Sequence, residues 1–277
     1  MAHRDINGAS LWYDILGEGE PILLHHGYTA CRENWLPVAE RLKSYFKVVL
    51  IECRGCGDSE NTESGYSIEQ YGEDAIELMH QLGHDTFSYA GHSMGGGVGM
   101  YIATAYPEKL NKLVLMASVG SKGLIGDSFR GNVEQRLEAR NNEDRAFFLQ
   151  EQLNGRFRLD VQTDEWIDKR IHQLMNIVSD GHLIDSMKSM QSMDYVDEMN
   201  DINTPTLVIA GGVDPLLKTN IEDYHRLPNA ALQVFFRAAH EIGIHETEGV
   251  ANAIIEFMQH GPLNADTLIV NSKKTAI

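Results

Sequence analysis

The chain has 277 residues, of which 43% are hydrophobic, and its formal net charge is −17 at pH 7. A chain of this length can bury one sizeable core and still carry an insertion. The acidic balance argues against nucleic acid and anionic membranes as partners, because both are bound through clustered lysines and arginines. We therefore expect a small-molecule substrate as the partner, and the sequence leaves open whether the protein is a monomer or a homodimer.

The N-terminus and the cysteines bear on the compartment. Residues 1–8 lack the apolar stretch of a signal peptide, and no segment reaches the roughly 18 to 20 apolar residues of a membrane span, so we expect a cytoplasmic protein. Cys31, Cys53 and Cys56 are an odd number in a chain large enough to fold without disulfides. Cys53 and Cys56 form a C-x-x-C pattern, but they lie in a glycine-rich turn after a strand, which disfavours a redox or metal role.

Short β-rich runs alternate with helical patterns through the first half of the chain. Strands are predicted at residues 11–16, 21–25, 46–51, 86–90 and 113–116, and helices at 35–43, 67–82 and 94–106. The later strands are almost continuously apolar, which is typical of strands buried on both faces of a parallel sheet. The alternation predicts right-handed strand–helix–strand units.

The second half begins with a change of pattern. From about residue 120 to residue 200 the helices are polar, charged and rich in methionine, and then the alternation resumes with strands at 206–210 and 232–236 and helices at 217–227 and 250–260. We therefore predict three parts: an α/β core formed by residues 1–119 and 201–262, a helical cap at 120–200, and a C-terminal tail at 263–277.

A candidate nucleophile lies between a predicted strand and a predicted helix. Gly91-His92-Ser93-Met94-Gly95 matches the pattern G-x-S-x-G at this point. A serine on such a sharp turn stands clear of the sheet, and the flanking glycines let neighbouring backbone pass closely. The motif alone would also fit a serine that merely caps the helix. Ser93 is therefore a candidate nucleophile that needs support from elsewhere in the chain.

The later chain supplies candidates for a base and an acid. A serine hydroxyl is a weak nucleophile and needs a general base, which a third group holds in place. Asp214 follows the predicted strand at 206–210, and His240 follows the predicted strand at 232–236. Either residue alone could be an ordinary loop residue. Their order after Ser93, each at the C-terminal end of a strand, predicts a catalytic triad of Ser93, Asp214 and His240.

Acyl transfer also requires backbone N–H groups that stabilise the oxyanion. Met94, the residue after the nucleophile, is predicted to provide one donor, and Tyr28, in the loop after the strand at 21–25, is predicted to provide the other. We interpret His25 and His26 as residues that support this loop through hydrogen bonds.

These segments, together with Arg54-Gly55-Cys56-Gly57-Asp58-Ser59, resemble the α/β-hydrolase superfamily over about residues 10–260. The resemblance is to the helical-cap branch, which contains esterases, enol-lactonases, carbon–carbon-bond hydrolases, epoxide hydrolases and haloalkane dehalogenases. It implies an α/β fold with an eight-stranded, mostly parallel, doubly wound sheet. It also implies a helical cap between the sixth strand and the strand that precedes the acid, and no cofactor or metal.

Two positions depart from the pattern of this branch. Glu52 stands where an aspartate usually precedes the Arg-Gly turn, and we expect the longer carboxylate to keep a structural role. His245 and Thr247 occupy places where the family usually has a glutamate and then a proline. His245 is therefore a rival to His240 as the catalytic base, although we expect it to be supportive.

A serine at the elbow disfavours epoxide hydrolase and haloalkane dehalogenase chemistry, since those enzymes attack with a carboxylate. The predicted function is hydrolysis of a carboxylic ester or lactone of a small, mainly apolar substrate, through an acyl-enzyme on Ser93. The same triad also permits perhydrolase or acyltransferase activity, and two further alternatives stay open. One is a carbon–carbon-bond hydrolase of a β-diketone-like acid with the same triad, and the other is a low-turnover small-molecule receptor on the same fold.

Residues of the early loop and the cap are expected to shape the pocket. Tyr28, Met187 and Met190 are predicted to line it, although methionine-rich helices are more often simply core. A carboxylate-bearing substrate would need a positive anchor. Several cap arginines could provide one or could be solvated surface: Arg130, Arg136, Arg140, Arg156 and Arg158.

Overall fold

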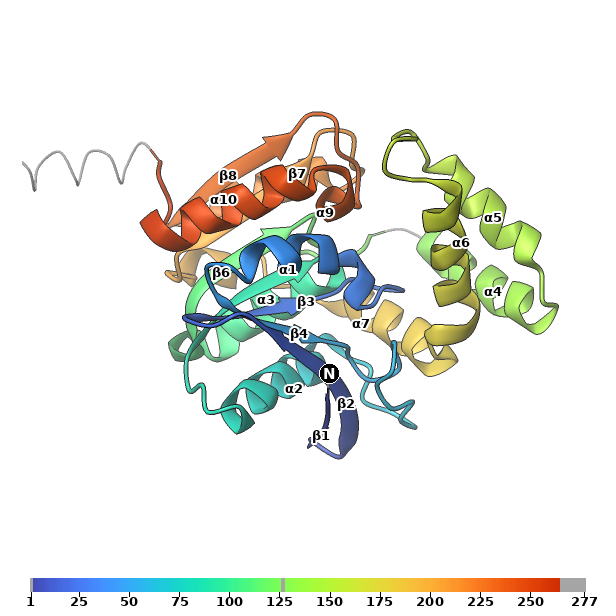
Figure 1. Cartoon of the computed structure of the whole chain (residues 1–277), viewed down its shortest axis with the longest axis horizontal. Coiled ribbons are helices and arrows are strands. Elements are labelled where there is room, and N and C mark those ends of the chain that lie inside the picture. Colours follow the sequence, from blue (N-terminus) through green and yellow to red (C-terminus); the bar gives the residue numbers. More distant parts are fainter. Residues whose placement is uncertain (1, 126–127, 265–277) are drawn as a thin grey trace, which may run out of the picture.

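The computed structural model describes residues 2–125 and 128–264. In this part of the chain, eight strands form one sheet in the order β1-β2-β4-β3-β5-β6-β7-β8 (Figure 1). β2 is antiparallel to both of its neighbours, and every other neighbouring pair is parallel. The sheet is thus the mostly parallel α/β sheet that the sequence predicts. The predicted tail lies outside the described residues except for Leu263 and Asn264.

Each predicted element of the core lies within three residues of the observed one. The strands are β1 (Ala2–Ile6), β2 (Ala9–Leu16), β3 (Pro21–His25), β4 (Lys47–Ile51), β5 (Phe87–His92), β6 (Leu110–Met116), β7 (Thr206–Gly211) and β8 (Ala230–Phe235). The core helices are α1 (Leu36–Leu42), α2 (Ile68–Gln81), α3 (Met94–Ala105), α8 (Leu217–Arg226), α9 (Ile242–His245) and α10 (Thr247–His260).

Helices cover both faces of the sheet. α1, α9 and α10 pack on one face around a cluster that includes Trp35 and Ile254, and α2 and α3 pack on the other around a cluster that includes Tyr71 and Val98. The central strands β3, β5 and β7 are buried on both faces, which explains their nearly continuous apolar sequences.

β1 is a strand that the apolar pattern did not predict. It forms an antiparallel hairpin with β2, and the two-residue turn is Asn7-Gly8, with φ of 47° and 78°. An Asn-Gly pair is a strong hairpin signal because both positions of such a turn adopt the left-handed conformation. β1 is largely exposed and polar, so the turn chemistry was the available signal.

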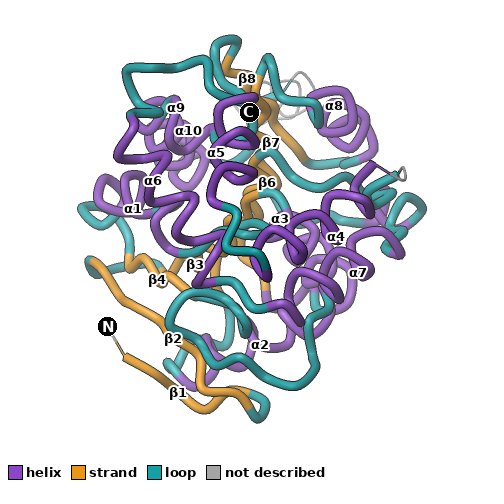
Figure 2. The backbone as a smooth tube through the Cα atoms, turned by 90° about the vertical axis from the view of Figure 1, so that its right-hand side faces the viewer, coloured by secondary structure: helices purple, strands orange, loops and turns teal. Residues whose placement is uncertain are grey.

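The segment between β6 and β7 is helical, as predicted, and it lies over one end of the sheet (Figures 1 and 2). Its α-helices are α4 (Ser128–Asn141), α5 (Arg145–Asn154), α6 (Asp164–His172) and α7 (Met187–Ser192), and its shorter turns are η3 (Gln173–Ile177), η4 (His182–Ser186) and η5 (Glu198–Asp201). α4 to α6 and the start of η3 share a small apolar cluster around Phe148, whereas Met187 and Met190 of α7 belong to the core. Within the described residues, no helix is long and apolar enough to cross a bilayer.

Candidate active site

The strand register brings the predicted site residues together at one edge of the sheet. β3 pairs with β5 so that His25 lies opposite Gly91, and the loops that follow these strands therefore emerge side by side. β7 pairs with β8 so that Gly211 lies opposite Phe235. Because parallel strands all end at the same edge, the loops carrying Tyr28, Ser93, Asp214 and His240 meet there.

Ser93 sits on a strained turn between β5 and α3. Its φ is 54° and its ψ is −113°, a conformation that non-glycine residues rarely adopt. The turn is possible because its flanking residues have no side chain: a Cβ at Gly91 would lie 2.0 Å from the carbonyl oxygen of Gly95, and a Cβ at Gly95 would lie 2.5 Å from that of His25. The local sequence thus forces the hydroxyl out of the sheet.

The three residues predicted as a triad form a hydrogen-bonded chain. Ser93 Oγ lies 2.9 Å from His240 Nε2, and His240 Nδ1 lies 3.0 Å from Asp214 Oδ2. Burial alone would raise the pKa of Asp214, but its contacts with His240 outweigh this effect and lower the pKa. Burial alone would lower the pKa of His240, yet the hydrogen bond and charge of Asp214 raise it above 6.5. The Leu216 N–H also donates to Asp214 Oδ1 at 2.9 Å.

His92 is a site residue that the sequence analysis did not single out, although it lies inside the G-x-S-x-G motif. Its ring lies 4.9 Å from that of His240, and its Nε2 donates to the His240 carbonyl oxygen at 2.9 Å. Burial lowers the pKa of His92 to about 4, so its ring is neutral near pH 7. His92 therefore holds the loop that carries the base without competing for its proton.

The loop after β3 packs directly against the nucleophile, as the oxyanion prediction requires. A Cβ at Gly27 would lie 2.9 Å from Ser93 Cβ, so only a glycine allows this approach. Tyr28 is the next residue and lines the pocket, and Met94 is the first residue of α3, where backbone N–H groups have no partner within the helix. Both residues are placed as the prediction expects, and their role as oxyanion donors stays a prediction.

His25 and His26 have the supporting contacts expected of them. His26 Nδ1 lies 2.9 Å from the Gly27 carbonyl oxygen, and His26 Nε2 accepts the Cys53 N–H at 3.1 Å. His25 Nδ1 lies 3.0 Å from the His26 carbonyl oxygen. Both rings are fully buried and thus fix the backbone that leads into Tyr28.

Among the described residues, two groups have ligand atoms close enough to hold a metal ion: Cys31, Glu33 and Glu52, and the fully buried set of His26, Cys53 and Cys56. The ligand atoms of the second set lie within 4.8 Å of one another, and all three side chains are buried. However, the lone pair of His26 Nε2 accepts the Cys53 N–H, so a metal would have to displace a hydrogen bond that holds the loop. The cysteines are free, in agreement with the prediction of no disulfide framework.

His245 contacts the backbone of the loop that carries His240. Its Nδ1 accepts the Ala239 N–H at 3.2 Å, and its ring packs edge-on against Phe157 of the cap at a centroid distance of 5.0 Å. Burial lowers its pKa. The residue with contacts to both Ser93 and Asp214 is His240, and the supporting role of His245 stays a prediction.

Glu52 has the structural contacts that we expected. Its buried carboxylate accepts the backbone N–H groups of Asp58 at 2.8 Å and Arg32 at 3.2 Å, and it pairs with the Arg32 guanidinium at 3.1 Å. A Cβ at Gly57 would lie 2.0 Å from Glu52 Oε2. The longer side chain thus links the turn after β4 to the segment that follows the Tyr28 loop.

A cavity of about 510 Å³ opens above Ser93 and His240. Its lining includes the three predicted pocket residues, Tyr28, Met187 and Met190. Both methionines are nearly fully buried, so they contribute to the core and to the cavity wall at once. The Tyr28 hydroxyl donates to the Leu183 carbonyl oxygen at 2.7 Å, which ties the early loop to the cap.

Those predicted cap arginines whose side chains the structure describes are each paired with a carboxylate. Arg136 lines the cavity but pairs with Glu151 at 2.9 Å. Arg140, Arg156 and Arg158 pair outside the cavity lining with Asp180, Asp164 and Asp160, respectively. The side chain of Arg130 lies outside the described residues.

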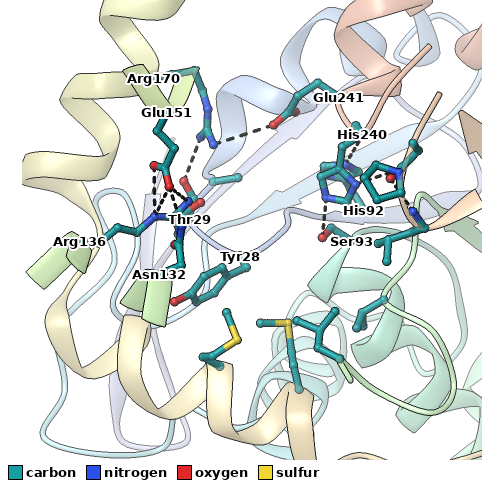
Figure 3. Close-up of a pocket in the computed structure, with 18 of the residues that line it drawn as sticks. Tyr28, Thr29, His92, Ser93, Asn132, Arg136, Glu151, Arg170, His240 and Glu241 are labelled. Atoms are coloured by element: carbon teal, nitrogen blue, oxygen red, sulfur yellow. Dashed lines mark hydrogen bonds and ion pairs between the residues drawn. The ribbon is translucent and has the colours of Figure 1, made fainter. Parts of the chain in front are cut away.

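The lining also includes polar residues that the sequence motifs do not indicate, among them Asn132, Glu151, Gln152, Arg170 and Glu241. Arg170 of α6 donates to the Thr29 carbonyl oxygen at 2.9 Å and lies 3.9 Å from Glu241, the residue after His240 (Figure 3). Glu241 could have been suspected from its position next to the base. The other four come from the cap helices α4, α5 and α6, where spacing alone does not say which face meets the site.

Comparison with known proteins identifies the family. The family model for the alpha/beta hydrolase fold matches residues 20–247, and the chain belongs to this family. A curated relative from Synechocystis, named provisionally as a non-heme chloroperoxidase, is 27% identical over 266 residues, which are 90% of this chain and 95% of the relative.

Solved structures agree on the fold. An esterase from Thermogutta terrifontis matches with a TM-score of 0.83 at 23% identity, over 94% of this chain and 98% of the esterase. The enol-lactonase from Burkholderia xenovorans matches with a TM-score of 0.82 at 21% identity, over 93% of this chain and 100% of the lactonase. At these identities the likeness concerns the fold, which several different hydrolytic reactions share.

Proposed function

We propose that the protein is a serine hydrolase that cleaves a carboxylic ester or lactone of a small, mainly apolar substrate. The observation that carries this proposal is the chain of hydrogen bonds from Ser93 Oγ through His240 to Asp214, at 2.9 and 3.0 Å, at the floor of a cavity. The cavity volume of about 510 Å³ lies within the usual range for small-molecule sites.

The reaction begins with transfer of the Ser93 proton to His240 Nε2, while Oγ attacks the substrate carbonyl carbon. Asp214 keeps the proton of His240 on Nδ1 and stabilises the imidazolium. The negative charge that develops on the carbonyl oxygen is stabilised by the backbone N–H groups of Met94 and Tyr28.

The tetrahedral intermediate then collapses. His240 gives its proton to the leaving oxygen, the bond from the carbonyl carbon to this oxygen breaks, and an acyl-enzyme on Ser93 remains. Water attacks the acyl-enzyme with His240 again as the base, and the carboxylic acid leaves while Ser93 regains its proton. These steps need no cofactor or metal, and the prediction of a cytoplasmic location accompanies the proposal.

Active-site labelling tests the nucleophile. A sulfonyl fluoride or organophosphate should add one label per chain to Ser93, as read by intact mass and peptide mapping. Ser93→Ala should lose both the label and the hydrolysis of p-nitrophenyl acetate, whereas Ser64→Ala, at an exposed serine remote from the cavity, should keep both. A label on another residue, or activity that survives in Ser93→Ala, would refute the assignment.

The same assay separates an enzyme from a receptor that uses the pocket only to bind. Repeated release of p-nitrophenol well beyond one equivalent indicates catalysis. A single equivalent followed by a stable acyl adduct indicates the receptor, because deacylation is the step that such a protein lacks.

A further inference from the structure

The cavity has two chemically different regions. The apolar part of its lining includes Val119, Leu124, Met187 and Met190, and the Val119 N–H donates to the Ser93 carbonyl oxygen at 3.0 Å. Across the cavity from Ser93, the cap contributes Asn132, Arg136 and Glu151, with the Tyr28 ring between the two regions (Figure 3). We call Asn132, Arg136 and Glu151 the cap polar cluster.

The charges within the cap polar cluster cancel. Arg136 Nε lies 3.0 and 3.2 Å from the two carboxylate oxygens of Glu151, and Arg136 Nη2 lies 2.9 Å from Glu151 Oε1. The Asn132 amide donates to the same Oε1 at 2.9 Å. The arginine and glutamate side chains are only 15% and 19% exposed, so water screens this pair incompletely. An entering carboxylate would therefore meet Glu151 as well as Arg136.

The second arginine of the cavity, Arg170, is engaged through Nη1, whereas its buried Nε has no hydrogen-bond partner among the described residues. Arg170 donates to the Thr29 carbonyl oxygen at 2.9 Å and to Gln173 Oε1 at 2.7 Å, and Glu241 lies 3.9 Å away. Among the described lining residues, the arginines are Arg136 and Arg170, and the carboxylates are Glu151, Glu241 and Asp214. The described lining therefore has no excess positive charge that could offset the desolvation of an anion.

We infer that the substrate carries an uncharged hydrogen-bonding group, such as a carboxamide or hydroxyl, at the end remote from its scissile carbonyl. This inference rests on the proposed hydrolysis at Ser93. The remote group lies against the cap polar cluster, where it can donate to Glu151 and accept from Arg136 or Asn132. A carboxylate at this position is selected against, which also disfavours a β-diketone-like acid as the substrate.

Three p-nitrophenyl esters with acyl chains of equal length test the inference. Their chains end in a methyl group, a primary carboxamide or a carboxylate. In the wild-type protein, kcat/KM should be at least as high for the amide as for the methyl ester, and about tenfold lower or more for the carboxylate, because like charges placed together at a binding site are strongly unfavourable. A carboxylate ester that is hydrolysed as fast as the amide overturns the inference.

Removal of the compensating charge gives a gain-of-function test. Glu151→Gln leaves Arg136 without its carboxylate, so the ratio of kcat/KM for the carboxylate ester to that for the amide ester should rise about tenfold. Glu165→Gln removes the same charge from an exposed position on α6, where Glu165 pairs with Lys169, and should leave the ratio unchanged. An unchanged ratio in folded Glu151→Gln contradicts the inference, and if that variant does not fold the wild-type panel decides.

The controls separate this inference from the proposed function. If wild-type protein hydrolyses p-nitrophenyl acetate through Ser93 but prefers the carboxylate ester, only the substrate inference fails. If no ester is turned over and Ser93 is not labelled, the proposed hydrolysis fails and the inference fails with it.

Discussion

The two ends of the cavity are built in different ways. At the core end, Ser93, Asp214 and His240 each stand in a loop at the C-terminal end of a strand of the sheet, and the strand register fixes how these loops meet. At the cap end, the cap polar cluster lies on α4 and α5, and its members hold one another through side-chain contacts.

This difference separates reactivity from selectivity. Loops anchored to strands keep their geometry because moving them would break buried backbone hydrogen bonds, and that rigidity suits a reaction that requires close alignment. Long side chains on an inserted helical segment can change partners with less loss, so they suit discrimination among substrates. Substitutions at the core end should therefore abolish the reaction. Substitutions at the cap end should instead change the relative rates at which different substrates are hydrolysed.

The largest effect is expected at the base. His240→Ala should lower kcat by about 10⁴-fold or more, since members of such triads act as a unit. His245→Ala should retain most of its kcat but lose stability by about 1–3 kcal/mol, because the Ala239 N–H would lose its buried acceptor. Both variants are to be assayed on one activated ester, with circular dichroism as the control for folding. If His245→Ala were inactive and His240→Ala remained active, His245 rather than His240 would be the catalytic base.

The pH profile should follow the protonation of His240. Only the neutral imidazole can accept the Ser93 proton, and Asp214 raises the pKa of His240 above 6.5. Log kcat/KM should therefore climb with pH and level off above this pKa, with a loss of about tenfold per pH unit on the acid side. A chemistry-limited ester should be used for the measurement. A flat profile from pH 5 to 8 would be incompatible with a histidine base.

Met187 should control the length of the acyl group. It lines the Ser93 cavity and also a second cavity of about 610 Å³, which includes Val133, Leu137 and Ile184. Met187→Ala opens the wall between them, so the preference for long over short acyl chains should rise about tenfold. Met193→Ala, at a buried methionine outside both linings, is the matched control. Identical chain-length profiles in the two variants would assign Met187 to the core alone.

A smaller effect is expected where the cap meets the core. Arg170 holds the Thr29 carbonyl beside the predicted oxyanion donor Tyr28, so Arg170→Met should lower kcat about five- to tenfold, less than outright loss of a donor. Arg156→Met removes a cap arginine that is paired with exposed Asp164, and this variant should leave kcat unchanged. KM should change less than kcat.

A pH measurement distinguishes positioning by Arg170 from a general structural role. His240 faces the charges of Asp214, Glu241 and Arg170 and the neutral ring of His92, and the positive charge of Arg170 lowers its pKa. Arg170→Met should therefore move the acid limb to higher pH, whereas Arg170→Lys should restore it. If the acid limb of Arg170→Met stays at the wild-type pH, the role of Arg170 is structural packing alone.

Much of the core end could be predicted because its signals are local. The elbow motif around Ser93 encodes a strained turn through its own glycines, and Asp214 and His240 follow strands that their apolar runs make visible. The contact of His92 with the base loop was also within reach, since His92 belongs to the motif. Strand β1 was missed because its signal is the Asn7-Gly8 turn rather than an apolar run.

The sequence by itself determined the fold family, the order of the core strands and helices after β1 and the three residues of the predicted triad, because short-range periodicity and turn chemistry specify these features. Only the tertiary structure decided which cap side chains face Ser93 and how their charges pair. Arg136 and Glu151 are 15 residues apart and belong to different helices, so their meeting depends on how α4 packs against α5. Arg170 reaches Thr29 across 141 residues of sequence. Contacts of this kind arise from the packing of one element on another, which no local pattern records.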